Sequence, residues 1–167
     1  MCRIYILKIF LAIIEQKRRW GIEMKIFEVT TQEDLQREFD IRLKVFVDEQ
    51  KVPAEEELDD QDHLDGNCKH FLATTDDNIA VGTGRVRLLE DYGKIQRVAV
   101  SKEYREHGIG RLIIQACEDK AKELGAKKAK LDAQVQAQGF YEKLGYEVKS
   151  GVFLDAGIEH VLMVKPL

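Results

Sequence analysis

The run Arg105–Gly110 (REHGIG) is the segment whose residue types and spacing are best suited to chemistry. It follows the strand-like stretch 94–100 and precedes a long stretch with helical spacing of apolar residues. Glycine costs roughly 1 kcal/mol relative to alanine inside a helix, so Gly108 and Gly110 need a reason to stand here. Two interpretations are open. The glycines relieve strain in an ordinary strand-to-helix turn, or they let backbone N–H groups converge on an anion.

The second interpretation rests on the physics of a helix start. The first N–H groups of a helix have no acceptor within the helix and carry a partial positive charge. A glycine-bearing loop before the helix lets those groups surround a phosphate. Arg105 and Arg111 flank the loop and add positive charge. The segment therefore has the chemistry of a pyrophosphate cradle.

The elements that position this loop follow from hydrophobic periodicity and turn residues. Helical spacing predicts a helix over 32–49, a long helix that ends at Gly125, and a short helix over 135–144. The predicted strands cover 25–29, 69–75, 79–89, 94–100, 129–133, 146–149 and 160–164. This order predicts an α+β domain with a mixed sheet flanked by helices, antiparallel early and parallel where the long helix crosses over.

Composition limits the function classes. The 167 residues fit one domain, and the net charge of −4 gives no indication of general nucleic-acid binding, so no nucleic-acid partner is expected. Three cysteines without zinc-type spacing predict a reduced, cytoplasmic protein with no metal site.

Residues 1–23 are treated apart from the predicted domain, 24–167. The apolar run Ile4–Ile14 is interrupted by Lys8 and is too short to cross a membrane, so no stable membrane association is expected. Either this extension is an amphipathic helix, or Met24 is the natural start. A clean strand pattern begins at Met24, and the second interpretation is favoured because the codons of Lys17–Trp20 can contain a purine-rich ribosome-binding sequence just upstream of the Met24 codon.

Two motifs carry a resemblance to a known family. The pattern VAV-x4-R-x-x-G-x-G around Arg105, Gly108 and Gly110 resembles the acetyl-CoA motif of the GNAT N-acetyltransferase superfamily. The segment Gln134–Tyr146 (QVQAQGFYEKLGY) resembles that family's second motif. Its matching residues are Ala137, Tyr141, Glu142, Lys143, Leu144 and Gly145. The stretch 41–62 further resembles small bacterial members of the ElaA type.

The resemblance implies a cofactor site and a mechanism. The sheet is expected to splay after the strand that precedes the loop, where the backbone of Val98 and Val100 would pair with the pantetheine of acetyl-CoA. The pyrophosphate would be held by the N–H groups of Glu106, His107, Gly108, Ile109, Gly110 and Arg111. Tyr141 would be the general acid that protonates the departing thiolate. Gln134 stands where the family usually has asparagine, which puts its role in orienting the cofactor or acceptor in doubt.

The general base is the least determined role. Many relatives use a glutamate on the strand before the loop, but Lys94 and Gln96 stand there. Glu49 or His63 is the candidate retained, beside Asp59, Asp62 or a water relay. Surface roles for Glu49 and His63 are the alternative interpretation.

The acceptor is expected to be a primary amine of a small molecule or peptide. Seven carboxylates between Glu55 and Asp65 predict a solvated loop, or else a surface that attracts a cationic acceptor. Two other functions stay open. Arg42, Val45 and Phe46, followed by Glu57, Asp59 and Asp62, fit the outline of an acyl-homoserine-lactone synthase. A non-catalytic acyl-CoA-binding regulator would keep the loop without turnover. The chain is expected to be a monomer or a homodimer.

Overall fold

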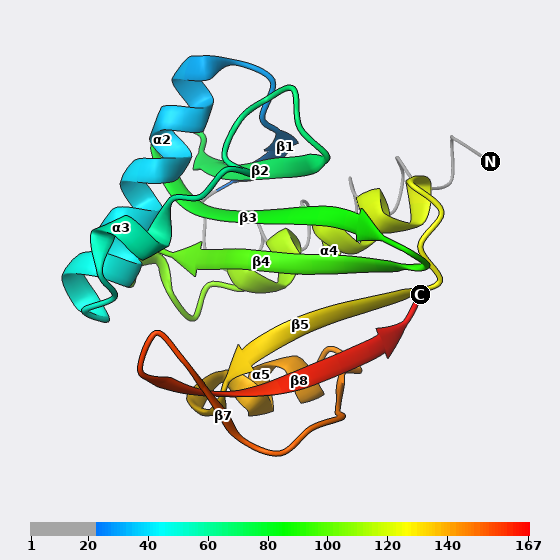
Figure 1. Cartoon of the computed structure of the whole chain (residues 1–167). Coiled ribbons are helices and arrows are strands. Elements are labelled where there is room, and N and C mark those ends of the chain that lie inside the picture. The colour runs from blue at the N-terminus through cyan, green and yellow to red at the C-terminus, as the bar shows by residue number, and fades with distance from the viewer. Residues whose placement is uncertain (1–22) are drawn as a thin grey trace.

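The structure, a computed structural model, describes residues 23–167, so the prediction for the N-terminal extension falls almost entirely outside the described residues (Figure 1). One eight-stranded sheet runs in the order β1-β2-β3-β4-β5-β8-β6, and β7 pairs with β8. The strands are β1 (Met24–Glu28), β2 (Cys68–Thr75), β3 (Ala80–Leu89), β4 (Tyr92–Val100), β5 (Lys128–Gln134), β6 (Glu147–Val148), β7 (Phe153–Asp155) and β8 (Ile158–Pro166). Among the strands of residues 23–167, only β4 and β5 pair in parallel, so the predicted mixed, mostly antiparallel α+β fold is confirmed.

Helices cover both faces of the sheet. They are α2 (Gln32–Arg42), α3 (Ala54–Glu57), α4 (Ile109–Glu123) and α5 (Gln138–Glu142), with short η1 (Leu43–Glu49), η2 (Lys102–Tyr104) and η3 (Val135–Ala137). Successive residues of a strand point to opposite faces. Phe71 and Ala73 of β2 join the core cluster that contains the α4 residues, whereas Leu72 joins the cluster that contains the α2 residues. Helices α2 and α4 therefore pack on opposite sides of the sheet.

Helix α4 lies very close to the strands beneath it. A Cβ added at Gly84 would lie 2.6 Å from Ile113, and one added at Gly93 would lie 2.5 Å from Ala121. Both distances are shorter than any real carbon contact, so the two glycines set how near the helix can approach. This close packing fixes the height of the α4 N-terminus above the sheet, and with it the position of the REHGIG loop.

The sheet opens at its centre. Strands β4 and β5 pair at three positions only, from Tyr92 opposite Lys128 to Lys94 opposite Lys130, and they diverge beyond that point (Figure 1). The splay expected after the strand before the loop is therefore confirmed. A bulge lies on the diverging part of β4, where Arg97 adopts a φ of 55° and the register with β3 shifts.

The predicted helix over 32–49 is confirmed, but its last part differs from an α-helix. The N–H of Gln50 donates to the carbonyl of Val45 across a widened turn, and residues 43–49 form a π-helix. π-helical turns are rare and often mark functional sites. Here the widened turn lies beside the opening between β4 and β5.

Candidate active site

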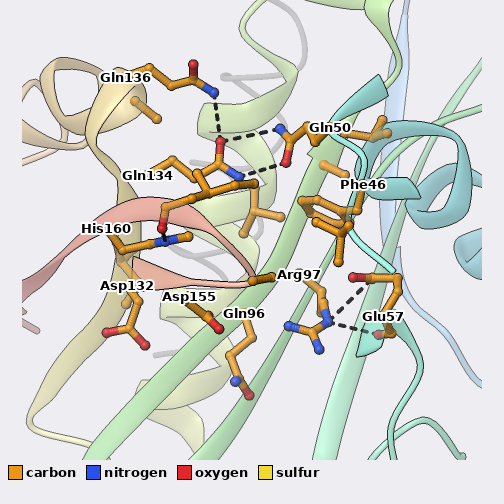
Figure 2. Close-up of a pocket in the computed structure, with 18 of the residues that line it drawn as sticks. Phe46, Gln50, Glu57, Gln96, Arg97, Asp132, Gln134, Gln136, Asp155 and His160 are labelled. Carbon is orange, nitrogen blue, oxygen red and sulfur yellow. Dashed lines mark hydrogen bonds and ion pairs between the residues drawn. The ribbon is translucent and has the colours of Figure 1, made fainter. Parts of the chain in front are cut away.

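A cavity of about 450 Å3 occupies the opening between β4 and β5. Its walls come from η1, α3, β4, β5, η3, α5 and β8, with the turn between β7 and β8 (Figure 2). Five of the predicted site residues line it: Val98, Val100, Arg105, Gln134 and Tyr141. Sequence reasoning missed other lining residues, among them Phe46, Gln50, Arg97, Gln136, Asp155 and His160.

The REHGIG loop ends at the first residue of α4. Gly108 precedes the helix with a φ of 77°, and Glu106 has a φ of 66°, so left-handed backbone recurs in this short segment. The first hydrogen bond into α4 runs from the N–H of Leu112 to the carbonyl of Gly108, which leaves the N–H groups of residues 109–111 without an acceptor inside the helix. This geometry fits an anion such as a pyrophosphate.

Gly110 and Arg105 contact the elements that surround the loop. A Cβ at Gly110 would lie 3.2 Å from the Phe140 ring, so glycine lets α4 and α5 meet here. Arg105 donates from Nε to the carbonyl of Val100 at 2.9 Å and forms an ion pair with Glu49 at 2.7 Å. Arg105 thus connects the end of β4 to the end of the π-helix. The remaining loop residues, 106–111, do not line the cavity itself.

Tyr141 reaches the cavity from α5. Its ring lies edge-on to Phe140 and to Tyr146, at centroid distances of 5.0 Å and 5.9 Å. Burial raises the pKa of the Tyr141 phenol to about 12. The hydroxyl therefore keeps its proton at neutral pH, which is the state that an acid catalyst needs before the reaction.

Three glutamine amides form a chain across the cavity (Figure 2). Gln134 Nε2 donates to Gln50 Oε1 at 2.7 Å, and Gln50 Nε2 donates back to Gln134 Oε1 at 3.3 Å. Gln136 Nε2 also donates to Gln134 Oε1, at 2.8 Å. Gln134, the last residue of β5, is thus held by Gln50 at the end of the π-helix. Its sequence context did not indicate this partner.

The residues predicted as a general base do not line the cavity. Glu49 is held by Arg105, as described above, and the exposed His63 ring packs on Gly66. Asp59 and Asp62 are bound by arginine side chains. The structure thus does not bring Glu49 or His63 together with Tyr141 around the cavity, and their roles as base stay predictions.

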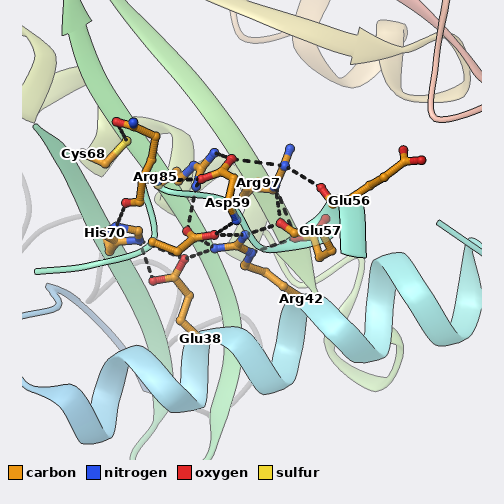
Figure 3. A network of polar contacts seen from close by, with 11 residues as sticks. Glu38, Arg42, Glu56, Glu57, Asp59, Cys68, His70, Arg85 and Arg97 are labelled. Atoms are coloured by element: carbon orange, nitrogen blue, oxygen red, sulfur yellow. Dashed lines mark hydrogen bonds and ion pairs between the residues drawn. The ribbon is translucent and has the colours of Figure 1, made fainter. Parts of the chain in front are cut away.

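The acidic segment is not the solvated loop that its composition predicts. Residues 54–57 form one helical turn, α3, and three of the seven carboxylates are bound in a buried ionic network (Figure 3). Asp62 lies 2.6 Å from nitrogens of both Arg42 and Arg85, and Glu57 lies 2.7 Å from Arg42 Nε. The expectation was wrong because the arginines come from α2 and β3, far from the segment in sequence.

The pKa values in this network follow from its charges. The hydrogen bonds from Arg85 hold the pKa of Asp59 well below its usual range. Burial raises the pKa of Asp62, but the hydrogen bonds from Arg42 and from the N–H of Asp59, together with the charges of Arg42 and Arg85, outweigh burial and the pKa is lowered. Burial would also lower the pKa of Arg42, yet Asp62 and Glu57 raise it. Asp59, Asp62 and Arg42 stay charged at neutral pH, so the network ties the segment to the sheet.

The network also shapes the cavity. Arg97, whose side chain leaves the bulge of β4, donates from Nε to the carbonyl of Glu57 at 3.1 Å and lies 3.3 Å from its carboxylate (Figure 3). Both residues line the cavity. The buried charges on the α2 side of the sheet therefore hold one wall of the candidate active site in place.

Residues 16–167 match the family model described as an acetyltransferase (GNAT) domain. The chain belongs to the GNAT acetyltransferase family. A Bacillus subtilis protein described as an acetyltransferase is 46% identical over 142 residues, which cover 85% of this chain and 96% of that protein.

Two solved structures have a similar fold. An N-acetyltransferase from Lactobacillus plantarum superposes with a TM-score of 0.78 at 30% identity, over 86% of this chain and 98% of that one. Escherichia coli ElaA superposes with a TM-score of 0.73 at 26% identity, over 86% of this chain and 99% of that one.

Membership supports the mapping of the two motifs onto this cavity. GNAT enzymes use acyl-CoA as the acyl donor, and the cavity lies between the two motif segments that the sequence resemblance identified. No helix among residues 23–167 is long and apolar enough to span a membrane.

Proposed function

We propose that this GNAT protein is a cytoplasmic N-acetyltransferase that transfers the acetyl group of acetyl-CoA to a primary amine of a small molecule or peptide. The observation that carries the proposal is the cavity between the diverging strands β4 and β5, with Tyr141 on its wall and the α4 N-terminus beside it. Family membership supports this function over a lactone synthase.

Different residues of the chain would bind different parts of acetyl-CoA. The N–H groups from Glu106 to Arg111 would hold the pyrophosphate, and the backbone of Val98 and Val100 would pair with the pantetheine. Bound acetyl-CoA supplies a thioester carbonyl that an amine can attack. Gln134, fixed by Gln50 and Gln136, would present its amide to the bound molecules.

Tyr141 would act when the carbon–sulfur bond breaks. Its hydroxyl would donate a proton to the departing sulfur, which lowers the cost of the negative charge that develops there. The Tyr141 phenol is protonated at neutral pH, as a proton donor must be, and it lines the cavity.

The acidic segment gives limited support to a cationic acceptor. Its buried carboxylates are neutralised by arginines, so only the exposed ones can attract a positive charge: Glu55, Glu56, Asp60 and Asp65. The proposal therefore covers amine acceptors in general, whether the protein is a monomer or a homodimer.

The first test is acetyl-CoA binding by thermal shift, because a ligand that binds only the folded state raises the melting temperature. Gly108→Asp should abolish the shift, since it adds a negative charge and strain at a left-handed position. A shift that survives in Gly108→Asp would remove the loop from the proposed site.

The second test is turnover with a panel of primary amines. Turnover is measured as the release of the free CoA thiol. Tyr141→Phe should lower turnover by about 100-fold or more and leave acetyl-CoA affinity unchanged. Tyr92→Phe is the matched control, because Tyr92 lies at the start of β4 and does not line the cavity. Binding of acetyl-CoA without thiol release for any amine would instead support a non-catalytic acyl-CoA-binding regulator.

A further inference from the structure

His160 is the one histidine on the cavity wall among the described residues. It lies on β8, where it pairs with Gln134 of β5, and only 9% of its surface is exposed. Its ring stacks on Phe153 of β7, with centroids 6.0 Å apart and planes 23° from parallel. Strand pairing and ring stacking therefore fix the side chain in one orientation.

One hydrogen bond sets which ring nitrogen of His160 is protonated. Nδ1 lies 2.8 Å from the carbonyl oxygen of Ile158, and a carbonyl oxygen can only accept. Nδ1 must therefore carry a hydrogen, so in the neutral ring the lone pair is on Nε2. No hydrogen bond to Nε2 is found within residues 23–167. Figure 2 shows the ring directed from β8 into the cavity.

A histidine held by a hydrogen bond at one nitrogen, with the other nitrogen facing a reaction cavity, has the arrangement of a general base. The carboxylates that line the same cavity are less suited. Glu57 is paired with Arg42 and Arg97, and Asp132 is paired with Lys94. Asp155 and Glu56 lie at its exposed rim.

We propose that His160 Nε2 accepts the proton of the acceptor amine. The amine lone pair forms a bond to the thioester carbonyl carbon, and the bond from that carbon to sulfur breaks. One amine proton moves to His160 Nε2, and the Tyr141 hydroxyl supplies a proton to the sulfur. The His160 imidazolium then returns its proton through solvent, and Tyr141 is reprotonated. The products are an amide and the free thiol of CoA. This assignment rests on the proposed function, because an amine must be acetylated for a base to be needed.

The decisive variant is His160→Asn. Asparagine keeps an N–H group near the position of Nδ1, so it can still donate to the Ile158 carbonyl, but it has no basic nitrogen. With the most active amine of the panel, kcat/KM should fall by about 100-fold or more, whereas the acetyl-CoA affinity should not change. The acid side of the pH profile should lose the fall that the wild type shows as its base is protonated. The charged residues that line the cavity with His160 on the neighbouring strands are Asp132 of β5, Asp155 of β7 and Arg97 of β4 (Figure 2).

A second variant keeps the test valid if His160→Asn is poorly folded. Free imidazole should restore turnover to His160→Ala in a concentration-dependent manner, which a purely structural role would not allow. The tautomer can be measured separately from the 15N shifts of histidine-labelled protein. A neutral ring protonated at Nε2 would overturn the assignment.

The outcomes separate this assignment from the function on which it rests. Wild-type protein that neither binds acetyl-CoA nor releases thiol would refute both. Wild-type turnover that His160→Asn retains within threefold, with an unchanged pH profile, would refute the assignment alone. Loss of turnover in His63→Asn but not in His160→Asn would place the base in the acidic segment and overturn it as well.

Discussion

Replacing Asp62 by asparagine should remove the centre of the buried ionic network. The Asp62 carboxylate accepts from Arg42 at 2.6 Å and 2.9 Å, from Arg85 at 2.6 Å and from the N–H of Asp59 at 2.9 Å. The Arg42 and Arg85 side chains are 0% and 1% exposed, so neither can turn to water for compensation. Breaking a buried pair by removing one partner costs about 3–5 kcal/mol.

The assay is urea unfolding of wild type and Asp62→Asn at pH 7. We expect a lower midpoint with an unchanged slope, which marks a change in stability alone. For a domain of this size, the same loss lowers the melting temperature by about 6–20 °C. The matched control is Asp60→Asn, because Asp60 is exposed and two residues away, and its effect should stay within about 0.5 kcal/mol.

The dependence of the free energy of unfolding on acidic pH gives a second test of the same network. The pKa values of Asp59 and Asp62 are lowered in the folded protein, so the unfolded chain binds more protons as the pH falls. Their stabilisation is complete above the ordinary carboxyl pKa of about 4 and is lost as the pH falls through the folded values. Asp62→Asn should therefore weaken the dependence of stability on pH in this range. A loss within about 0.5 kcal/mol, as expected for Asp60→Asn, would refute the assigned importance of the network.

Three further predictions follow from single sites. The raised pKa of Tyr141, about 12, means that its ionisation should not reduce turnover below about pH 10; a loss near pH 9 in wild type that is absent in Tyr141→Phe would contradict this. Gly93→Ala should cost about 1–3 kcal/mol in urea unfolding, because the new Cβ would lie 2.5 Å from an α4 alanine, whereas Gly139→Ala meets nothing within 4 Å and should cost nothing. Burial raises the pKa of the Cys117 thiol, so a thiol reagent should label Cys117 only after unfolding, and rapid labelling of the native protein, located by mass spectrometry, would count against the packing of α4.

The main elements of the fold could be predicted because each carries its own local signal. Alternating apolar residues indicated the long strands, and the glycines at 108 and 125 marked the limits of α4. The short strand β7 was missed, since three exposed residues, 153–155, have no alternation to detect. The fate of the acidic segment was mispredicted for a different reason. A sequence shows that a side chain is charged, but it does not show which residue pairs with that side chain. Arg85, which pairs with Asp62, lies 23 residues further along the chain.

The candidate site likewise contains residues that could be predicted from the sequence and residues that could not. Tyr141, Gln134 and Arg105 were found because they lie within continuous motifs that resemble those of the family. His160 and Arg97 could not be found by these means. His160 reaches the cavity because β8 returns to pair with β5, and Arg97 reaches it through a bulge with a left-handed backbone. Both depend on topology and register, which no short stretch of sequence records.

The opening between β4 and β5 divides the sheet into two halves. Beyond the three residue pairs that join these strands, the sheet has two inner margins in addition to its outer ones. A strand margin is a template on which another extended chain can add by backbone pairing, whatever its side chains. An extended molecule with amide groups of its own, seated in the cavity, would therefore continue the sheet across the gap, and its binding would depend on backbone geometry more than on which side chains line the walls.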